Sequence, residues 1–469
     1  MQTRYTSADQ WADAKDGVIP APYALEEGEQ IIDQYLEPVI FHNVNGPDIG
    51  VTTCGVIVKD GLYFKDLDNS GELAPYKDWR LSPEQRAEDM VKHLRLDQQA
   101  GLVLNTLFNS PVVPTRAEAT NAEGKLELGK IYKHHNPGEK PMPGPLPGMT
   151  VSIDDSHVLE KHIAAGVYRG DMRCEAGMVA LYHNAGTQML EYEACKGGVA
   201  IPYSLHTNPI NIGYPDSLGI GAAVIGDGNT DMVYEMAQTD RKMMKAEGLN
   251  IMYGPQVDVT SDPRWPRTSG TYGERPDVTS DIAEALVKGY QDGDNGLNEG
   301  SVVLTIKHFP GDAPSENGFE PHVPIGQWRI YRTPGSMEKY HLPPFQRAFD
   351  HKVSSIMPDY SRIATDGRAV PQTYRGEITS TEEVPSAYSK ELITDLARNK
   401  MGFDGYVNSD SGITTVQIYG VENLTEPERY AKAISAGTDV IGGNTDPENI
   451  VKAVEDGLLP KADLDRASY

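Results

Sequence analysis

The stretch Gly405-Tyr406-Val407-Asn408-Ser409-Asp410-Ser411-Gly412 carries the clearest indication of the fold. It is a short β-prone run that follows a helix-like segment at 391–400 and ends at a carboxylate among small polar residues. Buried parallel strands have this pattern, and in α/β barrels the strand exit carries catalytic groups. Asp410 is therefore predicted to be a working carboxylate. The same residues also fit a helix N-cap, because Ser and Asp cap helices well.

The chain around this stretch predicts alternating helices and strands. Helices are expected at 182–195, 231–247, 281–291, 340–351, 391–400, 426–436 and 447–456, and strands at 199–204, 251–259, 301–306, 354–357, 405–409 and 439–441. Such alternation without clear antiparallel hairpins predicts a parallel sheet. Polar clusters follow several strands, which favours an α/β fold of the (β/α)8-like TIM barrel type over an open sheet.

The first 80 residues differ from the rest. They are rich in loops with short strand-like runs, and Ser82-Pro83-Glu84-Gln85 then has the pattern of a helix start. We expect a loop-rich N-terminal extension at 1–80 and the catalytic barrel at 81–469. The Pro- and Gly-rich region 109–148 is expected to be a long surface loop.

Composition excludes several classes of partner. The 469 residues carry a net charge of −26, and such a surface repels phosphate, so neither nucleic acid nor an anionic membrane is expected to bind. No apolar run is long enough for a transmembrane helix, and residues 1–17 lack the apolar core of a signal peptide. The three cysteines form no disulfide framework.

The stretch Asp66-Leu67-Asp68-Asn69-Ser70-Gly71-Glu72-Leu73 resembles the first part of a calcium loop. Oxygen-bearing side chains alternate along it, and a glycine occupies the turn, so Asp66, Asp68 and Ser70 are the predicted ligands. The match is incomplete because the twelfth position is Lys77 instead of glutamate. An Asp-rich turn without an ion fits the same residues. No cofactor is expected to be required, and a structural calcium is the only ion that the sequence suggests.

A second polar cluster follows the clearest strand. Lys307-His308-Phe309-Pro310-Gly311-Asp312 extends the β-branched run at 301–306. Neighbouring strand residues point to opposite faces, so Lys307 and His308 can face one ligand only if the strand breaks at Pro310-Gly311. A cation and an imidazole together suit a polyhydroxylated ligand. A lysine extending from the strand end beside a capping histidine is the structural alternative.

Two further clusters lie in loops. In Ser261-Asp262-Pro263-Arg264-Trp265-Pro266-Arg267-Thr268, the Arg267 fork suits hydroxyls or a carboxylate, and Trp265 suits either a sugar ring or the core. Structural pairing of one arginine with Asp258 or Asp262 fits equally well. The strand at 354–357 ends in a polar exit, Pro358-Asp359-Tyr360.

From about Asp66 to its last residue, the chain resembles glycoside hydrolase family 3, the β-glucosidase and exo-β-glucanase family. Five motifs carry the resemblance in the family's order and spacing. They are Asp262-Pro263-Arg264-Trp265-Pro266-Arg267-Thr268 with Tyr272-Gly273-Glu274, Lys307-His308-Phe309-Pro310-Gly311, Leu342-Pro343-Pro344-Phe345, Ile356-Met357-Pro358-Asp359-Tyr360 and Gly402-Phe403-Asp404-Gly405-Tyr406-Val407-Asn408-Ser409-Asp410.

The resemblance implies roles for individual residues. Asp410 stands at the position of the family's nucleophile. Arg267, Lys307 and His308 stand where the family holds the hydroxyls of the sugar in the −1 subsite, and Tyr360 matches an aromatic residue near the nucleophile. The resemblance therefore implies a retaining hydrolase with a covalent glycosyl-enzyme intermediate.

Two departures from the family pattern bear on sugar binding. Asn208 stands where the family usually has an aspartate that grips two sugar hydroxyls. An amide still forms hydrogen bonds to hydroxyls, but it loses the added strength of a charge. Pro266 replaces a residue that is usually small.

The proton donor is the second requirement of a retaining glycosidase, at about 5–5.5 Å from the nucleophile. In family β-glucosidases it is generally a glutamate from a second α/β domain, and we expect this sequence to lack that domain. Related β-N-acetylglucosaminidases use an Asp/His pair on the loop after Lys-His-Phe-Pro-Gly. Here Glu320-Pro321-His322 is similar in form, so His322 is the candidate acid/base within the chain.

Three functions remain open. The first is hydrolysis of a terminal β-glucosyl unit from β-glucosides or β-glucan oligosaccharides, with a second chain or domain supplying the acid. The second is a β-N-acetylhexosaminidase-type reaction using His322, and the third is a non-catalytic sugar-binding barrel. The first is favoured because Asp410 and most of the −1 residues are present. We expect an extracellular or periplasmic protein whose signal has been removed from this sequence.

Overall fold

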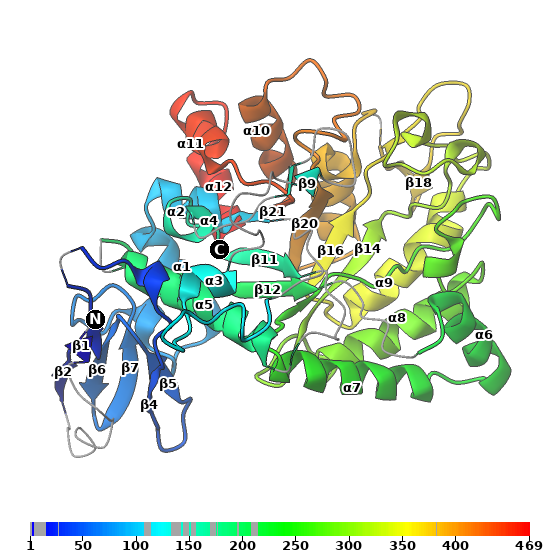
Figure 1. The fold of residues 1–469 in the computed structure, drawn as a ribbon. Coiled ribbons are helices and arrows are strands. Elements are labelled where there is room, and N and C mark those ends of the chain that lie inside the picture. Colours follow the sequence, from blue (N-terminus) through cyan, green and yellow to red (C-terminus); the bar gives the residue numbers. More distant parts are fainter. Residues whose placement is uncertain are drawn as a thin grey trace.

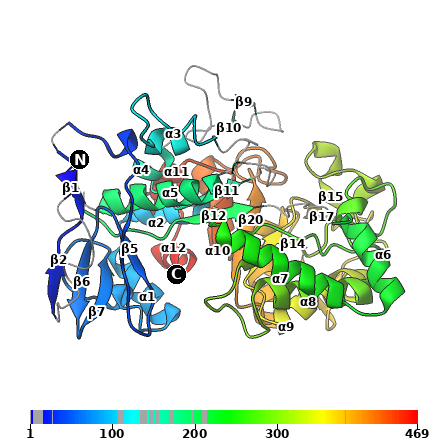
Figure 2. The same cartoon turned by 60° about the horizontal axis from the view of Figure 1, so that its bottom comes forward.

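The computed structural model describes residues 2–3, 16–26, 28–106, 114–132, 142–143, 150–151, 156–168, 175, 177–194, 197–207, 214–380 and 382–469. A parallel barrel surrounded by helices forms most of the molecule, and a small antiparallel sheet lies at one side of it (Figures 1 and 2). The barrel carries the site, and the antiparallel sheet comes from the N-terminal region.

Eight parallel strands form the barrel in chain order. They are β8 (Leu104–Asn105), β11 (Ala165–Tyr168), β12 (Ser204–Thr207), β13 (Ile251–Met252), β14 (Val303–Phe309), β16 (Ser355–Pro358), β20 (Tyr406–Ser411) and β21 (Val440–Gly442). β21 pairs with β8, and a parallel bridge between Thr106 and Gly166 joins β8 to β11. This bridge closes the ring, so the predicted TIM barrel is confirmed.

Helices separate most of these strands. They include α5 (Met178–Ala194), α6 (Ser217–Asp227), α7 (Asp231–Ala246), α8 (Pro276–Tyr290), α9 (Leu342–Asp350), the π-type helix η9 (Glu391–Lys400), α10 (Glu426–Ala436) and α11 (Pro447–Glu455), and α12 (Lys461–Ser468) ends the chain. Local chemistry defines their ends: α10 begins with a capping box between Thr425 and Glu428 and ends at Gly437, whose φ of 110° favours glycine. Seven of these helices match the predicted ranges within a few residues.

One predicted strand is shifted. The apolar run at 199–204 contributes only Ser204 to β12, which continues to Thr207. The earlier backbone groups are bonded elsewhere: the Ala200 N–H donates to the Leu67 carbonyl, and Gln98 Nε2 donates to the Val199 carbonyl at 2.9 Å. The run therefore connects the barrel to the N-terminal region instead of extending the barrel strand.

The N-terminal region contains more regular structure than a loop-rich extension. β2 (Gly17–Ile19), β6 (Gly55–Lys59) and β7 (Leu62–Asp66) form an antiparallel sheet, and β4 (Val39–Phe41) pairs with β5 (Ile49–Val51). Glu191 of α5 holds this region to the barrel, because its carboxylate accepts hydrogen bonds from the Thr52 backbone and hydroxyl and pairs with Lys65. The division at residue 80 stays a prediction.

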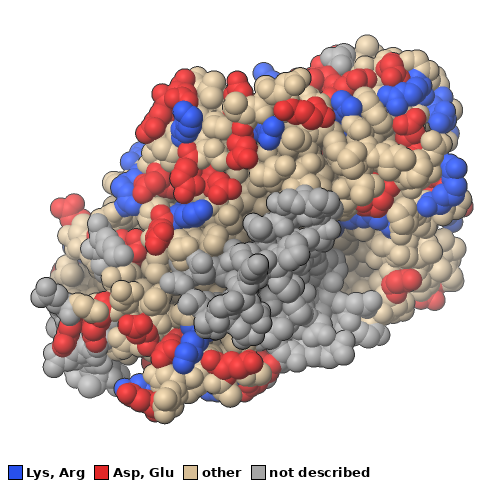
Figure 3. All heavy atoms as spheres, turned by 45° about the horizontal axis from the view of Figure 1, so that its top comes forward, with Lys and Arg blue, Asp and Glu red and all other residues tan. Residues whose placement is uncertain are grey.

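The surface agrees with the acidic composition. Acidic and basic side chains are interspersed over the face in Figure 3, and no continuous basic patch is visible among the residues coloured there. Among the described residues, no helix combines the length and the apolar character needed to cross a bilayer.

Candidate active site

Asp410 lies in β20, inside the strand and not in the loop that the sequence suggested to follow it. One carboxylate oxygen, Oδ1, is anchored: the Tyr360 hydroxyl lies 2.8 Å from it, and the Ser411 backbone N–H donates to it at 2.7 Å. The other oxygen, Oδ2, has no hydrogen-bond partner among the described residues. His308 Nε2 lies 3.8 Å from it. The carboxylate is thus oriented through one oxygen and open at the other.

The surroundings keep this carboxylate ionised. Burial alone would raise the pKa of Asp410, whose side chain is only 11% exposed, but nearby basic side chains hold the pKa below its ordinary value. His308 contributes most among them, followed by His322, Lys307 and Arg267. Because the pKa of His308 is itself about 4, this imidazole is neutral near pH 7, and the fixed positive charges near Asp410 come from Lys307 and Arg267.

Asp258 fixes the orientation of His308. It accepts hydrogen bonds from the His308 backbone N–H at 3.1 Å and from ring Nδ1 at 2.9 Å. Arg267 Nη2 lies 3.1 Å from the other ring nitrogen, Nε2, which must accept because an arginine only donates. Burial, followed by the charge of Arg267, lowers the pKa of His308 to about 4. His308 is therefore a neutral, oriented imidazole at neutral pH.

Lys307 and His308 both lie near Asp410, but the strand irregularity lies before Phe309 and not at Pro310-Gly311, where the break was predicted. The pairing of β14 with β16 shifts register between Lys307 and Phe309. Lys307 Nζ donates to the Tyr253 carbonyl at 2.7 Å, and only 9% of the residue is exposed. A strand irregularity thus replaces strict alternation at this position.

His322 lies beside the same carboxylate. Its ring packs edge-on against Tyr360, with 4.9 Å between ring centroids. Glu320 orients it: Glu320 Oε1 lies 2.5 Å from ring Nδ1, and Glu320 Oε2 accepts from the His322 backbone N–H at 2.8 Å. Nδ1 is therefore engaged by Glu320, and Nε2 has no hydrogen-bond partner among the described residues.

A buried ionic network behind the site escaped sequence analysis. The fully buried Arg329 guanidinium pairs with Asp312 and with Asp359, the latter at 3.1 Å, and Asp312 also accepts from Arg267 Nη1 at 3.0 Å. Burial raises the pKa of Asp359 to about 7. The carboxylates and imidazole of Asp258, His308 and Asp312 lie within 4.8 Å of one another, but two guanidinium groups already balance their charge.

The predicted calcium ligands stand apart from this site. Asn208 lies outside the described residues. Asp66, Asp68 and Ser70, the predicted calcium ligands, lie at the end of β7 and accept hydrogen bonds from Lys77. The structure therefore brings together Arg267, Lys307, His308, His322, Tyr360 and Asp410.

A comparison with known families identifies the barrel. Residues 195–469 match the family model described as the glycosyl hydrolase family 3 N terminal domain. The chain belongs to glycosyl hydrolase family 3. The matched region includes all six residues that meet in the site.

Relatives agree with this assignment. The chain is 30% identical over 446 residues to a periplasmic β-glucosidase/β-xylosidase of Dickeya chrysanthemi, covering 87% of this chain and 61% of that protein. It is 33% identical over 302 residues to β-glucosidase C of Emericella nidulans, covering 59% of this chain and 46% of that protein. The family 3 chain thus spans about six-tenths of the Dickeya protein's length.

Solved structures confirm the fold. An exo-1,3/1,4-β-glucanase from a Pseudoalteromonas species aligns with a TM-score of 0.61 and 21% identity, covering 82% of this chain and 54% of that one. A family 3 β-N-acetylglucosaminidase from a Paenibacillus species aligns with a TM-score of 0.56 and 19% identity, covering 80% and 61%. At these identities the likeness concerns the fold alone.

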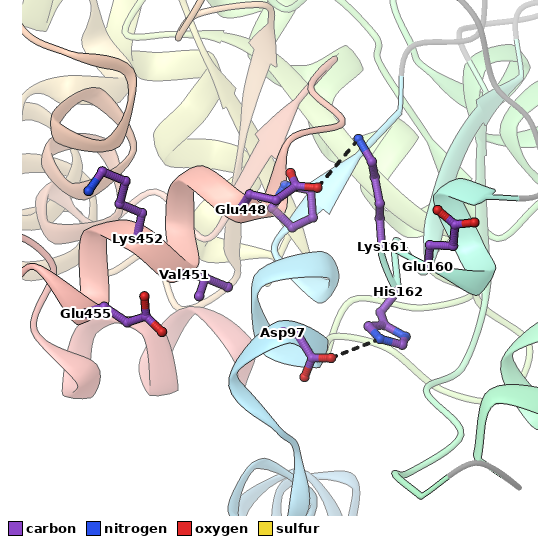
Figure 4. Close-up of a pocket in the computed structure, with 9 residues that line it drawn as sticks. Asp97, Glu160, Lys161, His162, Glu448, Val451, Lys452 and Glu455 are labelled. Carbon is purple, nitrogen blue, oxygen red and sulfur yellow. Dashed lines mark hydrogen bonds and ion pairs between the residues drawn. The ribbon is translucent and has the colours of Figure 1, made fainter.

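A separate cavity of about 300 Å³ lies between α2 (Leu96–Leu102), the segment 156–162 and α11 (Figure 4). Two pairs of its charged groups contact one another: His162 Nε2 lies 3.1 Å from Asp97 Oδ2, and Lys161 Nζ lies 3.9 Å from Glu448 Oε1. None of the predicted catalytic or sugar-binding residues lines it. The cavity is therefore separate from the group of residues around Asp410.

Replacing Tyr360 with phenylalanine is expected to shift the pH dependence of hydrolysis. The hydroxyl lies 2.8 Å from Asp410 Oδ1 and 2.7 Å from the Ser411 carbonyl, and its hydrogen bond to Oδ1 stabilises the charged form of Asp410. Its loss is therefore expected to raise the pKa of that carboxyl group. The acid limb of the kcat/KM profile for an aryl β-glucoside should move to higher pH, and kcat should fall about 10-fold. Replacing the half-exposed Tyr340 with phenylalanine is the matched control and should leave the profile unchanged. An unmoved acid limb in Tyr360→Phe would contradict the role assigned to the hydroxyl.

Proposed function

We propose that this chain is the barrel of a retaining β-glycosidase that removes terminal β-linked glucosyl units from glucosides or glucan oligosaccharides. The observation that carries the proposal is the state of Asp410: Oδ1 is anchored, Oδ2 is open, and nearby cations keep the group ionised. A nucleophile needs these properties, because it must be charged, aimed and accessible. The names of the Dickeya and Emericella relatives support glucosides and xylosides as substrates.

In the proposed reaction, Asp410 Oδ2 attacks the anomeric carbon as the bond to the leaving-group oxygen breaks. The leaving oxygen takes a proton from an acid, and a glycosyl ester forms on Asp410. Water then attacks the same carbon, gives its proton to the conjugate base, and releases the sugar and the carboxylate. Lys307, Arg267 and His308 lie near Asp410 and are proposed to bind the sugar hydroxyls, with Asn208 assigned the same role from its sequence position.

His322 is the proposed acid/base within the chain. Glu320 engages ring Nδ1, so Nε2 is the nitrogen left to exchange a proton with the leaving group. The contact with Tyr360 places the ring next to the anchored carboxylate. A glutamate from a second domain or chain is the alternative donor, and its addition would raise activity on poor leaving groups.

The proposed function is tested by comparing two β-glucosides on the full chain and on His322→Ala. Phenyl β-glucoside needs protonation of its leaving group, whereas 2,4-dinitrophenyl β-glucoside does not. We expect His322→Ala to lose about 10²–10³-fold in kcat/KM on the phenyl substrate and less than about 10-fold on the dinitrophenyl substrate.

Two outcomes would contradict parts of the proposal. Equal losses on both substrates would exclude His322 as the acid/base. No release from the dinitrophenyl substrate by the unaltered chain, with glucose still bound, would favour the non-catalytic barrel. His351→Ala, at a half-buried histidine that pairs with Glu284 away from the site, is the matched control and should lose nothing.

The β-N-acetylhexosaminidase-type reaction is the second candidate. The Glu320–His322 pair favours it, because it matches in form the Asp/His pair that the family resemblance assigns to such enzymes. Parallel assays with the dinitrophenyl N-acetylglucosaminide and xyloside decide among the substrates, since the preferred sugar should give the highest kcat/KM. The word periplasmic in the name of the Dickeya relative supports the proposal that this chain also acts outside the cytoplasm.

A further inference from the structure

The twelve residues 66–77 follow the geometry of a calcium loop closely. In such loops, side chains at positions one, three and five and a backbone carbonyl at position seven supply oxygens, and a glycine at position six permits the turn. Here those side chains are Asp66, Asp68 and Ser70, and position seven is Glu72. Gly71 stands at position six with a φ of 76°, the left-handed conformation that favours glycine.

Lys77 stands at position twelve, where a calcium loop has a bidentate glutamate. Its side chain is fully buried, and its ammonium group lies among the same four oxygens. Nζ is 2.6 Å from Asp66 Oδ1, 2.8 Å from Ser70 Oγ and 2.9 Å from the Glu72 carbonyl, and it donates to Asp68 Oδ1. Every predicted calcium ligand is therefore already bonded to one internal cation.

We propose that the Lys77 ammonium group replaces the divalent ion in this loop. The charge balance supports the replacement. Two aspartates with one lysine leave one negative charge, and two aspartates and a glutamate with Ca²⁺ leave the same charge. The wild-type loop thus holds its oxygens together without metal. The side chain at position twelve decides whether the loop is filled by an ammonium group or binds a divalent ion. This proposal is independent of the proposed function.

The position of the loop gives the cation a structural role. The loop joins β7 to the helix α1 (Pro83–His93). Asn69 Oδ1 accepts from the Gly55 backbone N–H at 2.8 Å, on the sheet side, and the Leu67 carbonyl accepts from the Ala200 N–H at 2.7 Å, on the barrel side. A cation at the centre of the loop therefore stabilises the junction between the N-terminal sheet and the barrel.

The experiment compares the full chain with Lys77→Glu and Lys77→Met. Tb³⁺, which replaces Ca²⁺ in such loops, is the probe, because Tyr76 and Trp79 lie next to the site and can sensitise its emission. The wild type should give no sensitised emission that Ca²⁺ displaces, and its Tm should be equal in Ca²⁺ and in chelator. Lys77→Glu should bind one Tb³⁺, displaced by Ca²⁺, and its Tm should fall by about 5 °C in chelator and recover in Ca²⁺.

Lys77→Met is the matched control, since it removes the ammonium group without adding a carboxylate. In chelator, its Tm should lie below that of the wild type. Addition of Ca²⁺ should raise the Tm of Lys77→Met by less than it raises the Tm of Lys77→Glu. Ca²⁺-displaceable Tb³⁺ emission from the wild type would overturn the proposal, whether or not either variant folds. The proposal would also be overturned if Ca²⁺ raised the Tm of Lys77→Glu and of Lys77→Met by the same amount.

Discussion

Replacing Asp410 with alanine is expected to reduce the turnover of 2,4-dinitrophenyl β-glucoside by about 10⁴-fold or more. This substrate needs little help from an acid, so its hydrolysis depends mainly on the nucleophile. The alanine variant keeps Lys307, Arg267 and Tyr360 in place and removes only the attacking oxygen. Stopped-flow release of the phenol measures the effect, and the burst expected from the unaltered chain should disappear.

Two controls separate loss of chemistry from loss of fold. Azide should partly restore turnover of the Asp410→Ala variant, because a small anion can enter the space left by the carboxylate and attack the same carbon. Asp404→Ala removes an exposed aspartate that pairs with Lys352 at 2.8 Å near the start of β20. It should keep full activity, since it lies outside the site. Retained bursts in Asp410→Ala would assign the nucleophile to another residue.

Replacing Arg329 with methionine is expected to destabilise the chain by about 3–5 kcal/mol, because the change leaves buried carboxylates without their cation. Arg329 is fully buried between Asp312 and Asp359. The loss should be smaller at pH 5.5 than at pH 8. The pKa of Asp359 is already about 7, so below that pH the native state of the variant takes up a proton that removes the unpaired charge. Urea unfolding at the two pH values measures both effects.

The matched control for this change is Arg264→Met. Arg264 pairs with Asp262 at 2.6 Å, but its side chain is 66% exposed, and exposed pairs contribute about 0–1 kcal/mol. A loss as small in Arg329→Met as in Arg264→Met would show that the buried network adds nothing to stability. A loss independent of pH would exclude Asp359 as the group that takes up the proton.

Much of the barrel could be predicted because its signals are local. The capping box at Thr425 and Glu428 and the glycine at 437 mark α10 within the chain itself, and the β-branched run at 301–306 marks β14. β11 was missed, since Ala165–Tyr168 has little β-branched content. The shift of β12 was also invisible, because it depends on hydrogen bonds from Gln98 and to Leu67 far away in the chain.

In the site, too, some residues could be predicted from local sequence and others depend on contacts between distant segments. Asp410, Lys307 and His308 lie within the last residues of their strands, so their approximate positions follow from the alternation and from the family motifs. Arg329 gave no signal, because its partners Asp312 and Asp359 are recognisable only when the strands are assembled. The lysine at position twelve of the calcium-like loop was visible as a mismatch, but the sequence could not show that its ammonium group fills the loop.

The closure of the barrel has a consequence for the order in which the chain folds. The seam between β21 and β8 joins distant segments: the Gly443 N–H, directly after β21, donates to Asn105 Oδ1 of β8 across 338 residues. Contacts in the site span far shorter stretches, such as the 50 residues between Tyr360 and Asp410 and between Asp258 and His308. Closing a longer loop costs more entropy and slows folding. We therefore expect the half of the barrel that holds the site to assemble before the seam closes.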